Sequence, residues 1–219
     1  MQELSWLFDP LFLSIKVVLC QGALLIIFGL ALAYYLAFSK TKLRAILETI
    51  VTFPLIFPPI ATRFLLLYLL GKNGIVGKAL NLEIIFSFKA LVLAAFIASL
   101  PLFVKPVASA LGSLSKSLSE AAYSLGKYKF QTAIFVLFPC VRKSVAAAFI
   151  LALSRGLGEV GITLILGGNI IGKTDTISLA IYNAVYDGRS DQALALSLVL
   201  VVLSFILFWI INLLDKRRI

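Results

Sequence analysis

Residues 120–139 read EAAYSLGKYKFQTAIFVLFP and lie in a polar segment between two long apolar runs. The segment opens with residues that favour helix, turns at Gly126 and continues as a second amphipathic stretch. Leu118, Ala122 and Leu125 follow i, i+4, i+7 spacing, so we expect them to share a helix face. Gly126 fits a tight corner between two short helices, because glycine adopts left-handed backbone at little cost. In an arbitrary membrane protein this pattern would indicate a surface loop with two interfacial helices.

The composition of the chain is typical of an integral membrane protein. Of 219 residues, 61% are hydrophobic and only 14% are charged, and the mean hydropathy is +1.06. Soluble domains are about 25% charged. The length allows one membrane domain and no second, soluble one. The chain has no histidine, which excludes histidine-based metal centres and catalytic triads, and Cys20 and Cys140 are expected to be inert apolar side chains.

Five apolar runs are long enough to cross a membrane as helices, which takes about 20 residues. They cover residues 11–38, 46–70, 86–110, 144–166 and 193–214. The stretch PLIFPPI interrupts the second run, and two prolines lie in the third, so bends are expected there. The start of the chain is acidic rather than basic, so the first run is expected to be a retained span and not a signal peptide.

The basic residues indicate the orientation. Most of them fall in segments that would share one side of the membrane: Lys40, Lys42, Arg44, Lys116, Lys127, Lys129, Arg142, Lys143, Lys216, Arg217 and Arg218. The other side has Lys72, Lys78, Lys173 and Arg189. The positive-inside rule places the richer side in the cytoplasm, with the N-terminus outside and the C-terminus inside. This rule explains the net charge of +10 better than a nucleic-acid partner does.

Residues 167–174 read GGNIIGKT and match the G-x-x-x-x-G-K-[ST] pattern of phosphate-binding loops. Such a loop needs a strand before it, a helix after it and a magnesium-binding acid on a nearby strand. GITLIL, residues 161–166, could mimic the strand, but it ends a run long enough to span the membrane. The orientation also places the motif outside, where there is no ATP pool. We interpret it as a glycine-rich turn that matches by chance.

The spacing of residues 120–139 resembles the EAA motif of ABC importer permeases: Glu-Ala-Ala, three residues, Gly, nine residues, an aliphatic residue, one residue, an apolar residue and Pro. Val136 and Phe138 stand where Ile and Leu are usual, and both changes are conservative. In that family the segment forms coupling helices that dock into a groove on a separate ATPase subunit. Within residues 113–139, the resemblance assigns ATPase coupling to Glu120, Ala121, Ala122, Leu125, Gly126, Lys127, Tyr128 and Pro139.

Residues 52–77, 154–169 and 172–185 resemble the corresponding parts of molybdate-type permeases, with sulfate- and tungstate-type relatives close by. The resemblance implies the MetI-like fold of a type I ABC importer permease, an all-α polytopic protein with five transmembrane helices in the inner membrane. It implies a homodimer with two cytoplasmic ATPase subunits and an external oxyanion-binding protein. It further implies that this chain is a transport subunit without a cofactor, which moves molybdate, or else tungstate or sulfate, inward by alternating access.

Arg63, Arg155 and Glu159 lie well inside apolar runs, where a charge is costly. Arg155 and Glu159 are four residues apart on one helix face, and they form either a self-neutralising structural pair or part of the anion path. Arg63 stands where the resembling family usually has a small residue, often Gly. By depth, Arg63 and Glu159 could pair across the second and fourth spans and hold a gate closed. With Asn169, these are the candidate pathway or gate residues.

Two other classes of function make different predictions. A nucleotide-using membrane enzyme rests on GGNIIGKT alone and predicts ATP binding that Lys173→Ala abolishes. A partner-free channel or secondary carrier has no use for a coupling segment, so a bulky residue in place of Gly126 would leave its transport intact. An importer instead predicts a second docking surface, on the external side of the membrane. The mixed charges of residues 167–192 suit contact with a soluble partner there.

Overall fold

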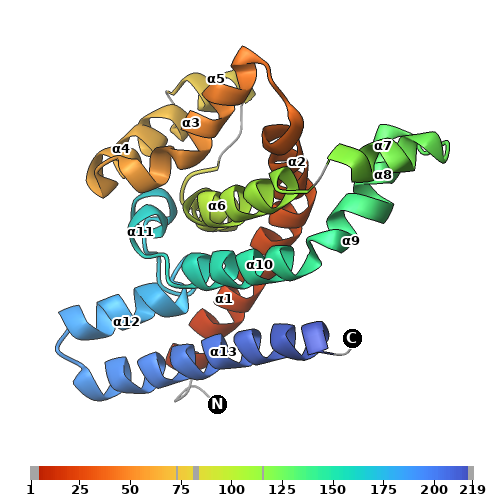
Figure 1. Ribbon diagram of the computed structural model, residues 1–219. Helices are drawn as coiled ribbons and strands as arrows, with labels where there is room; N and C mark the ends of the chain where they lie inside the picture. Colours follow the sequence, from red (N-terminus) through yellow and green to blue (C-terminus); the bar gives the residue numbers. More distant parts are fainter. Residues whose placement is uncertain (1–4, 73, 81–83, 115, 217–219) are drawn as a thin grey trace.

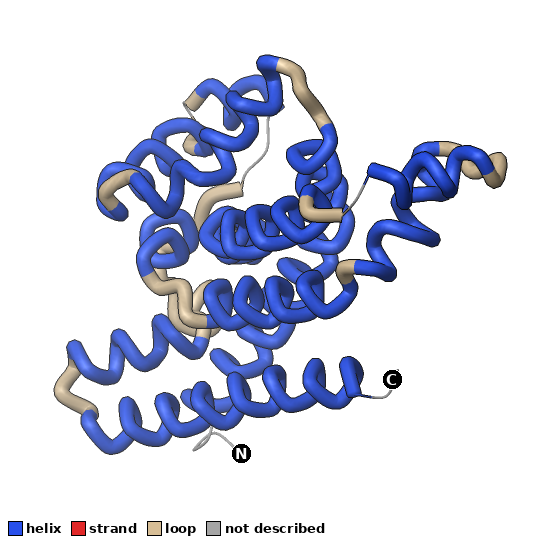
Figure 2. Tube along the Cα trace, in the orientation of Figure 1, coloured by secondary structure: helices blue, strands red, loops and turns tan. Residues whose placement is uncertain are grey.

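The computed structural model describes residues 5–72, 74–80, 84–114 and 116–216, and all regular secondary structure in these ranges is helical (Figure 1; Figure 2). The all-α class expected from the sequence is therefore confirmed. Ser115 of the expected coupling segment, and Arg217 and Arg218 of the orientation argument, lie outside the described residues.

The helices follow one another with short connections. In chain order they are α1 (Ser5–Leu24), the π-helical turn η2 (Leu25–Gly29), α2 (Leu30–Phe38), α3 (Lys42–Ile56), α4 (Pro59–Leu70), α5 (Ile75–Leu80), α6 (Phe88–Gly112), α7 (Lys116–Ser124), α8 (Lys129–Thr132), the π-helical turn η3 (Ala133–Leu137), α9 (Phe138–Cys140), α10 (Arg142–Leu157), α11 (Gly161–Gly167), α12 (Ile177–Tyr186) and α13 (Ser190–Lys216).

The first and third expected spans are long helices. α1, η2 and α2 form one continuous apolar helix of 34 residues, Ser5–Phe38. α6 runs through Pro101 and Pro106 without a break, so the bend expected in the third run does not interrupt the helix. α6 lies at the centre of the fold and packs against α1, α2, α3, α10 and α11 (Figure 1). Its fully buried Phe103 belongs to the main hydrophobic cluster.

The second expected span is broken where its prolines predicted a bend. α3 ends at Ile56, and Phe57 and Pro58 are extended, with ψ of 149° and 128°. A residue that precedes proline is driven out of helical backbone by the proline ring, and both Phe57 and Pro58 precede one. α4 then begins at Pro59, where a missing N–H costs nothing.

The fourth expected span is also two helices, because α10 ends at Leu157 and α11 begins at Gly161. By length and composition, two described helices could cross a membrane, Ser5–Phe38 and Phe88–Gly112. A third is added if the bent pair Lys129–Cys140 and Arg142–Leu157 counts as one span. Shorter apolar helices are Pro59–Leu70, Ile177–Tyr186 and Ser190–Ile206. The chain is thus confirmed as a helical protein with several apolar segments.

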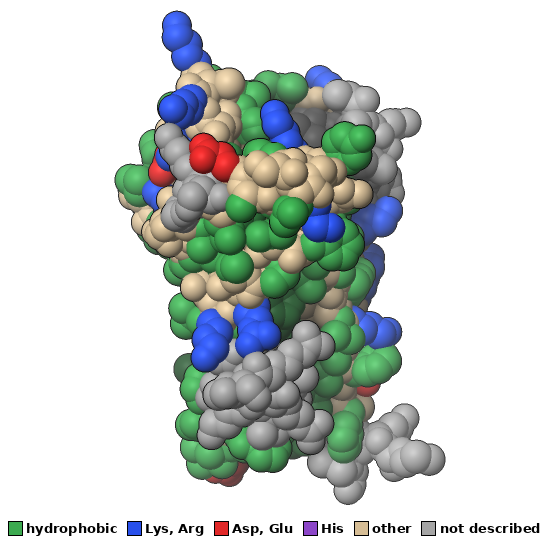
Figure 3. All heavy atoms as spheres, turned by 45° about the vertical axis from the view of Figure 1, so that its right-hand side comes forward, with side chains coloured by type: hydrophobic (Ala, Val, Ile, Leu, Met, Phe, Trp, Pro, Cys, Tyr) green, Lys and Arg blue, Asp and Glu red, His purple; other side chains and the backbone are tan. Residues whose placement is uncertain are grey.

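The surface of the protein is apolar over wide areas. Figure 3 shows one face, on which hydrophobic side chains form broad patches with Lys and Arg side chains scattered among them. Large exposed hydrophobic side chains occur on α1, α3, α4 and α13. Such surfaces suit contact with lipid or with other membrane-embedded subunits.

Candidate functional site: a projecting arm and a charged helix break

Helices α7 to α9, residues 116–140, project from the helical body and are called the arm below (Figure 1). α7 packs against α8 and η3, and α8, η3 and α9 follow one another without a break. Leu118, Leu137 and Phe138 join the main hydrophobic cluster and fix the base of the arm to the body. The expected pair of short helices with a corner between them is confirmed.

The corner of the arm depends on Gly126. Its φ is +79°, in the left-handed region, and its N–H and that of Lys127 donate to the carbonyl oxygens of Tyr123 and Ala122 at 2.9 and 3.1 Å. These bonds end α7 one residue before Leu125. The expected shared face is therefore wrong at one position: Leu118 and Ala122 point inward, but Leu125 leaves the helix and is 82% exposed.

The corner exposes several large apolar side chains outside the long apolar helices. Tyr128 and Phe130 are 78% and 76% exposed, next to Leu125. Glu120 and Ala121 are exposed on α7, whereas Ala122 is buried beneath them. Among the described residues, Glu120 forms no ion pair.

Two further residues of the assigned set shape the arm. Lys127 lies over the ring of Phe135, with its ammonium 5.5 Å from the ring centroid. Pro139 has no N–H to continue the helical ladder, and the preceding turn η3 is wide, with the N–H of Phe138 bonded to the carbonyl of Ala133. Beyond α9, Val141 leaves helical backbone, and the chain bends by 79° into α10. Pro139 therefore belongs to an elbow between the arm and the body.

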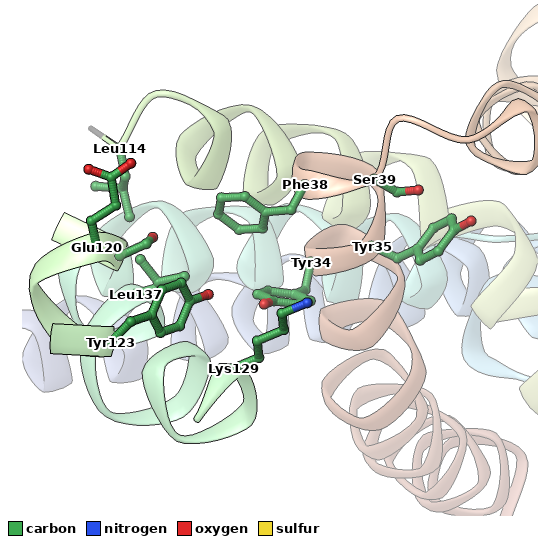
Figure 4. Close-up of a pocket in the computed structure, with 10 residues that line it drawn as sticks. Tyr34, Tyr35, Phe38, Ser39, Leu114, Glu120, Tyr123, Lys129 and Leu137 are labelled. Atoms are coloured by element: carbon green, nitrogen blue, oxygen red, sulfur yellow. The ribbon is translucent and has the colours of Figure 1, made fainter. Parts of the chain in front are cut away.

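A cavity of about 420 Å³ separates the arm from the end of α2. Figure 4 shows the side chains that line it, with Lys129 extending toward Tyr34. The lining residues are Tyr34, Tyr35, Phe38, Ser39, Leu114, Ser119, Glu120, Tyr123, Lys129 and Leu137. The arm is thus packed tightly at its base and loosely along α7.

The second group of candidates meets at the break between α10 and α11, residues 158–160. Glu159 is 2% exposed, and its Oε2 accepts from Arg155 at 2.6 Å while Oε1 accepts the backbone N–H of Ile162 at 2.7 Å. Both carboxylate oxygens are therefore used within the α10–α11 segment. The i, i+4 pair expected from the sequence is present.

Arg63 approaches the same break from α4. A Cβ placed on Gly161 would come within 1.9 Å of its Cζ and Nη2, so the guanidinium lies directly on the glycine backbone. Among the described residues Arg63 forms no ion pair or hydrogen bond. The expected Arg63–Glu159 pair is thus not formed in this structure, because Glu159 is already paired with Arg155.

Asn169 lies apart from these charges, in the turn after α11. Its side-chain amide exchanges two hydrogen bonds with Asn183 of α12, at 2.6 and 3.0 Å. Thr174 Oγ1 donates to the carbonyl of Gly167 and accepts from Ile170, which closes the turn. The structure therefore gives Asn169 a role in joining the turn to α12.

The same turn contains GGNIIGKT, and its surroundings do not suit a nucleotide. Residues 161–166, the expected strand mimic, lie in helix α11. Lys173 is exposed. Asp175 is 6% exposed and accepts the N–H of Gly172 at 2.8 Å, and burial raises the pKa of its carboxyl group above the usual 3.8. A strand-borne phosphate loop is excluded here.

Sequence reasoning missed a buried polar network beside the break. Gln21 of α1 is fully buried, and its Nε2 donates to Ser99 Oγ and to the carbonyl of Ala152, each at 2.9 Å. Its amide lies against Gly156, where a Cβ would come within 2.1 Å of Oε1. A lone Gln inside the apolar run CQGALL was the available signal.

Comparisons with known proteins agree with this architecture. Residues 26–219 match the family described as "Binding-protein-dependent transport system inner membrane component". The probable transport system permease protein NifC of Clostridium pasteurianum is 37% identical over 191 residues, covering 85% of this chain and 66% of that relative. The putative molybdenum transport system permease protein YvgM of Bacillus subtilis is 30% identical over 212 residues, covering 95% and 93%. The molybdenum transport system permease protein ModB of Haemophilus influenzae is 32% identical, covering 84% and 83%. This chain therefore belongs to the family of inner membrane components of binding-protein-dependent transport systems.

Proposed function

We propose that the chain is the permease subunit of an ATP-binding-cassette importer that carries a tetrahedral oxyanion, molybdate first, into the cell by alternating access. The family supports import that depends on a binding protein. Two relatives that are at least 30% identical over most of both chains carry molybdenum transport in their names. Tungstate and sulfate are the alternative substrates, because both are tetrahedral dianions like molybdate.

The observation that carries the coupling role is the exposed corner of the arm. Leu125, Tyr128 and Phe130 leave most of their apolar surface uncovered, on a projection whose corner is closed by backbone hydrogen bonds. A cluster of this kind marks a protein-binding surface. The partner is an ATPase subunit whose groove receives the corner, with the unpaired carboxylate of Glu120 at the rim.

The docking proposal has a direct binding test. Leu125→Asp places a charge in the centre of the contact and should weaken binding of the ATPase roughly tenfold or more. Ala45→Asp adds the same charge to the first turn of α3, away from the arm, and should leave binding unchanged. Affinity is measured with purified, detergent-solubilised permease and the cognate ATPase. Equal effects of the two changes would show that charge alone, and not the corner, controls binding.

The proposed function as an importer subunit also implies an assembly with other subunits. Two copies of the chain pair in the inner membrane, two ATPase subunits bind the arms from the cytoplasm, and an oxyanion-binding protein docks outside. Each chain has five spans, with α3–α4 and α10–α11 each counted as one broken span, and its N-terminus is outside.

Cysteine labelling tests this orientation. Single cysteines at positions 127 and 173, in a background with Cys20 and Cys140 replaced by Ser, should react with an impermeant reagent from opposite sides of the membrane. Labelling of both from one side overturns the orientation.

The elbow explains how movement of the arm reaches the pathway. When the ATPase subunits close, they displace the corner, and the continuous helix of α8, η3 and α9 transmits this displacement to Val141 and α10. α10 packs along α6 and ends at the break that holds Glu159. The arm therefore acts as a lever on the helices that surround the break.

Reconstitution tests the whole proposal. Proteoliposomes that contain the permease, the cognate ATPase and the binding protein should hydrolyse ATP faster and accumulate molybdate when molybdate is supplied. Permease without partners should bind no ATP. Accumulation without the ATPase would instead show a partner-free carrier, and stimulation by tungstate or sulfate in place of molybdate would correct the substrate.

A further inference from the structure

Arg63 is a cation without a negatively charged partner among the described residues. It lies in the middle of α4, PIATRFLLLYLL, where it is the only charged residue. Its side chain is partly buried. Placing a guanidinium among apolar side chains is unfavourable unless a counter-charge compensates it. Among the described residues no carboxylate provides that charge.

Three other basic side chains of the apolar helices lie against a compensating group. Lys105 of α6 pairs with Glu48 of α3 at 3.3 Å, and Arg155 pairs with Glu159 at 2.6 Å. Lys16 lies over the ring of Phe12, 4.0 Å from its centroid. Arg63 differs from these three, although it lies beside a carboxylate-bearing segment.

The break therefore has an excess positive charge. Arg63 and Arg155 bring two guanidinium groups to residues 155–161, and Glu159 brings one carboxylate, both of whose oxygens are already bonded. The guanidinium of Arg63 packs on one side against the backbone of Gly161. Its N–H donors make no hydrogen bond to described residues, so they are available to an acceptor.

We propose that Arg63 is a specificity-determining residue of the transport path, and that its guanidinium binds the oxyanion as it passes the α10–α11 break. The planar fork of an arginine matches two oxygens of a tetrahedral oxyanion. The missing counter-charge of Arg63 is then the transported anion itself. Glu159 and Arg155 form a neutral pair beside it, so the dianion meets one net positive charge and is not held too tightly to leave. This inference rests on the proposed import of an oxyanion.

The test uses the complete transporter in proteoliposomes, with permease, ATPase and binding protein, and sodium molybdate as the probe. Arg63→Gln removes the charge, Arg63→Lys keeps it, and Lys105→Gln is the control that removes a compensated cation elsewhere. ATP hydrolysis and molybdate uptake are measured on the same vesicles. Arg63→Gln should lower uptake roughly tenfold or more, which is the usual effect of one lost charge-assisted hydrogen bond. Hydrolysis stimulated by the loaded binding protein should stay within about twofold of the wild type.

The expected order of uptake is wild type, Arg63→Lys, then Arg63→Gln, with Lys105→Gln close to wild type. Three results would overturn the inference: unchanged uptake by Arg63→Gln, a lysine variant no better than the glutamine variant, or a parallel fall of uptake and hydrolysis. The last result indicates that Arg63 only supports packing. If the wild type itself shows neither stimulated hydrolysis nor uptake with molybdate, tungstate or sulfate, the proposed function fails instead.

Discussion

The arm and the α10–α11 break place their candidate functional residues in opposite environments. The arm exposes apolar side chains at a corner set by one glycine, and it lies outside the helical body. The break buries the carboxylate of Glu159, which pairs with Arg155, and the guanidinium of Arg63 reaches Gly161 of α11 from α4. An exposed apolar corner suits a protein partner, and a site with an unpaired guanidinium suits a small anion. The two regions should therefore control different steps of transport.

The largest effect is expected at the corner of the arm. Gly126→Val forces a β-branched residue into left-handed backbone, although its Cβ would meet no atom within 4 Å. The strain should displace Leu125 and Tyr128 and lower both ATPase binding and uptake roughly tenfold or more. Gly126→Asn is the matched control, because asparagine tolerates this backbone. Equal loss in both variants would show that glycine is needed for close contact with the partner rather than for its conformation.

A smaller effect is expected when the contact between the Arg63 guanidinium and the backbone of Gly161 is disrupted. Gly161→Ala places a methyl group where the Arg63 guanidinium lies, whereas Gly158→Ala meets only a carbonyl oxygen at 3.6 Å. Uptake should fall severalfold in Gly161→Ala, by about 1 kcal/mol of lost interaction, and stay near wild type in Gly158→Ala. The uptake assay in proteoliposomes distinguishes them. Identical behaviour of the two variants would mean that contact with Gly161 does not position Arg63.

The Glu159 carboxylate should affect stability more than transport selectivity. Glu159→Ala loses the bond to the Ile162 N–H and leaves Arg155 unpaired, which should cost on the order of 1–3 kcal/mol. Glu159→Gln keeps an acceptor for Ile162 and should cost less. Thermal unfolding of the purified permease measures both. A glutamine variant as unstable as the alanine variant would show that the ion pair, and not the backbone bond, supports α11.

The smallest effect is expected outside both regions. Lys173 is exposed and completes GGNIIGKT only as a sequence pattern. Lys173→Ala should leave ATP hydrolysis by the complete transporter unchanged, because its turn is closed by Thr174 and preceded by a helix. This assignment would be contradicted if Lys173→Ala lowered ATP hydrolysis. It would also be contradicted if the isolated permease bound ATP and Lys173→Ala abolished that binding.

The two regions also differ in what the sequence could reveal. The arm was predictable because its signal is local: the spacing around Gly126 requires a corner, and the structure has one. The exposure of Leu125 was not predictable, because it depends on the residue at which α7 ends. The Arg155–Glu159 pair was likewise predictable from its i, i+4 spacing.

The contacts that cross the fold were much harder to predict. Arg63 and Gly161 are 98 positions apart in the sequence, and Gln21 and Ser99 are 78 apart, so no local pattern encodes these contacts. Depth along two helices suggested an Arg63–Glu159 pair. That estimate could not show that Arg155 occupies the carboxylate, because competition between two guanidinium groups is decided by side-chain geometry.

The most direct measurement compares Gly126→Val and Arg63→Gln in the same assay, with ATP hydrolysis and molybdate uptake recorded on the same proteoliposomes. If the arm receives the energy and the break contacts the anion, Gly126→Val loses both activities, whereas Arg63→Gln keeps stimulated hydrolysis and loses uptake. The same pattern in both variants would contradict this division of roles between the arm and the break.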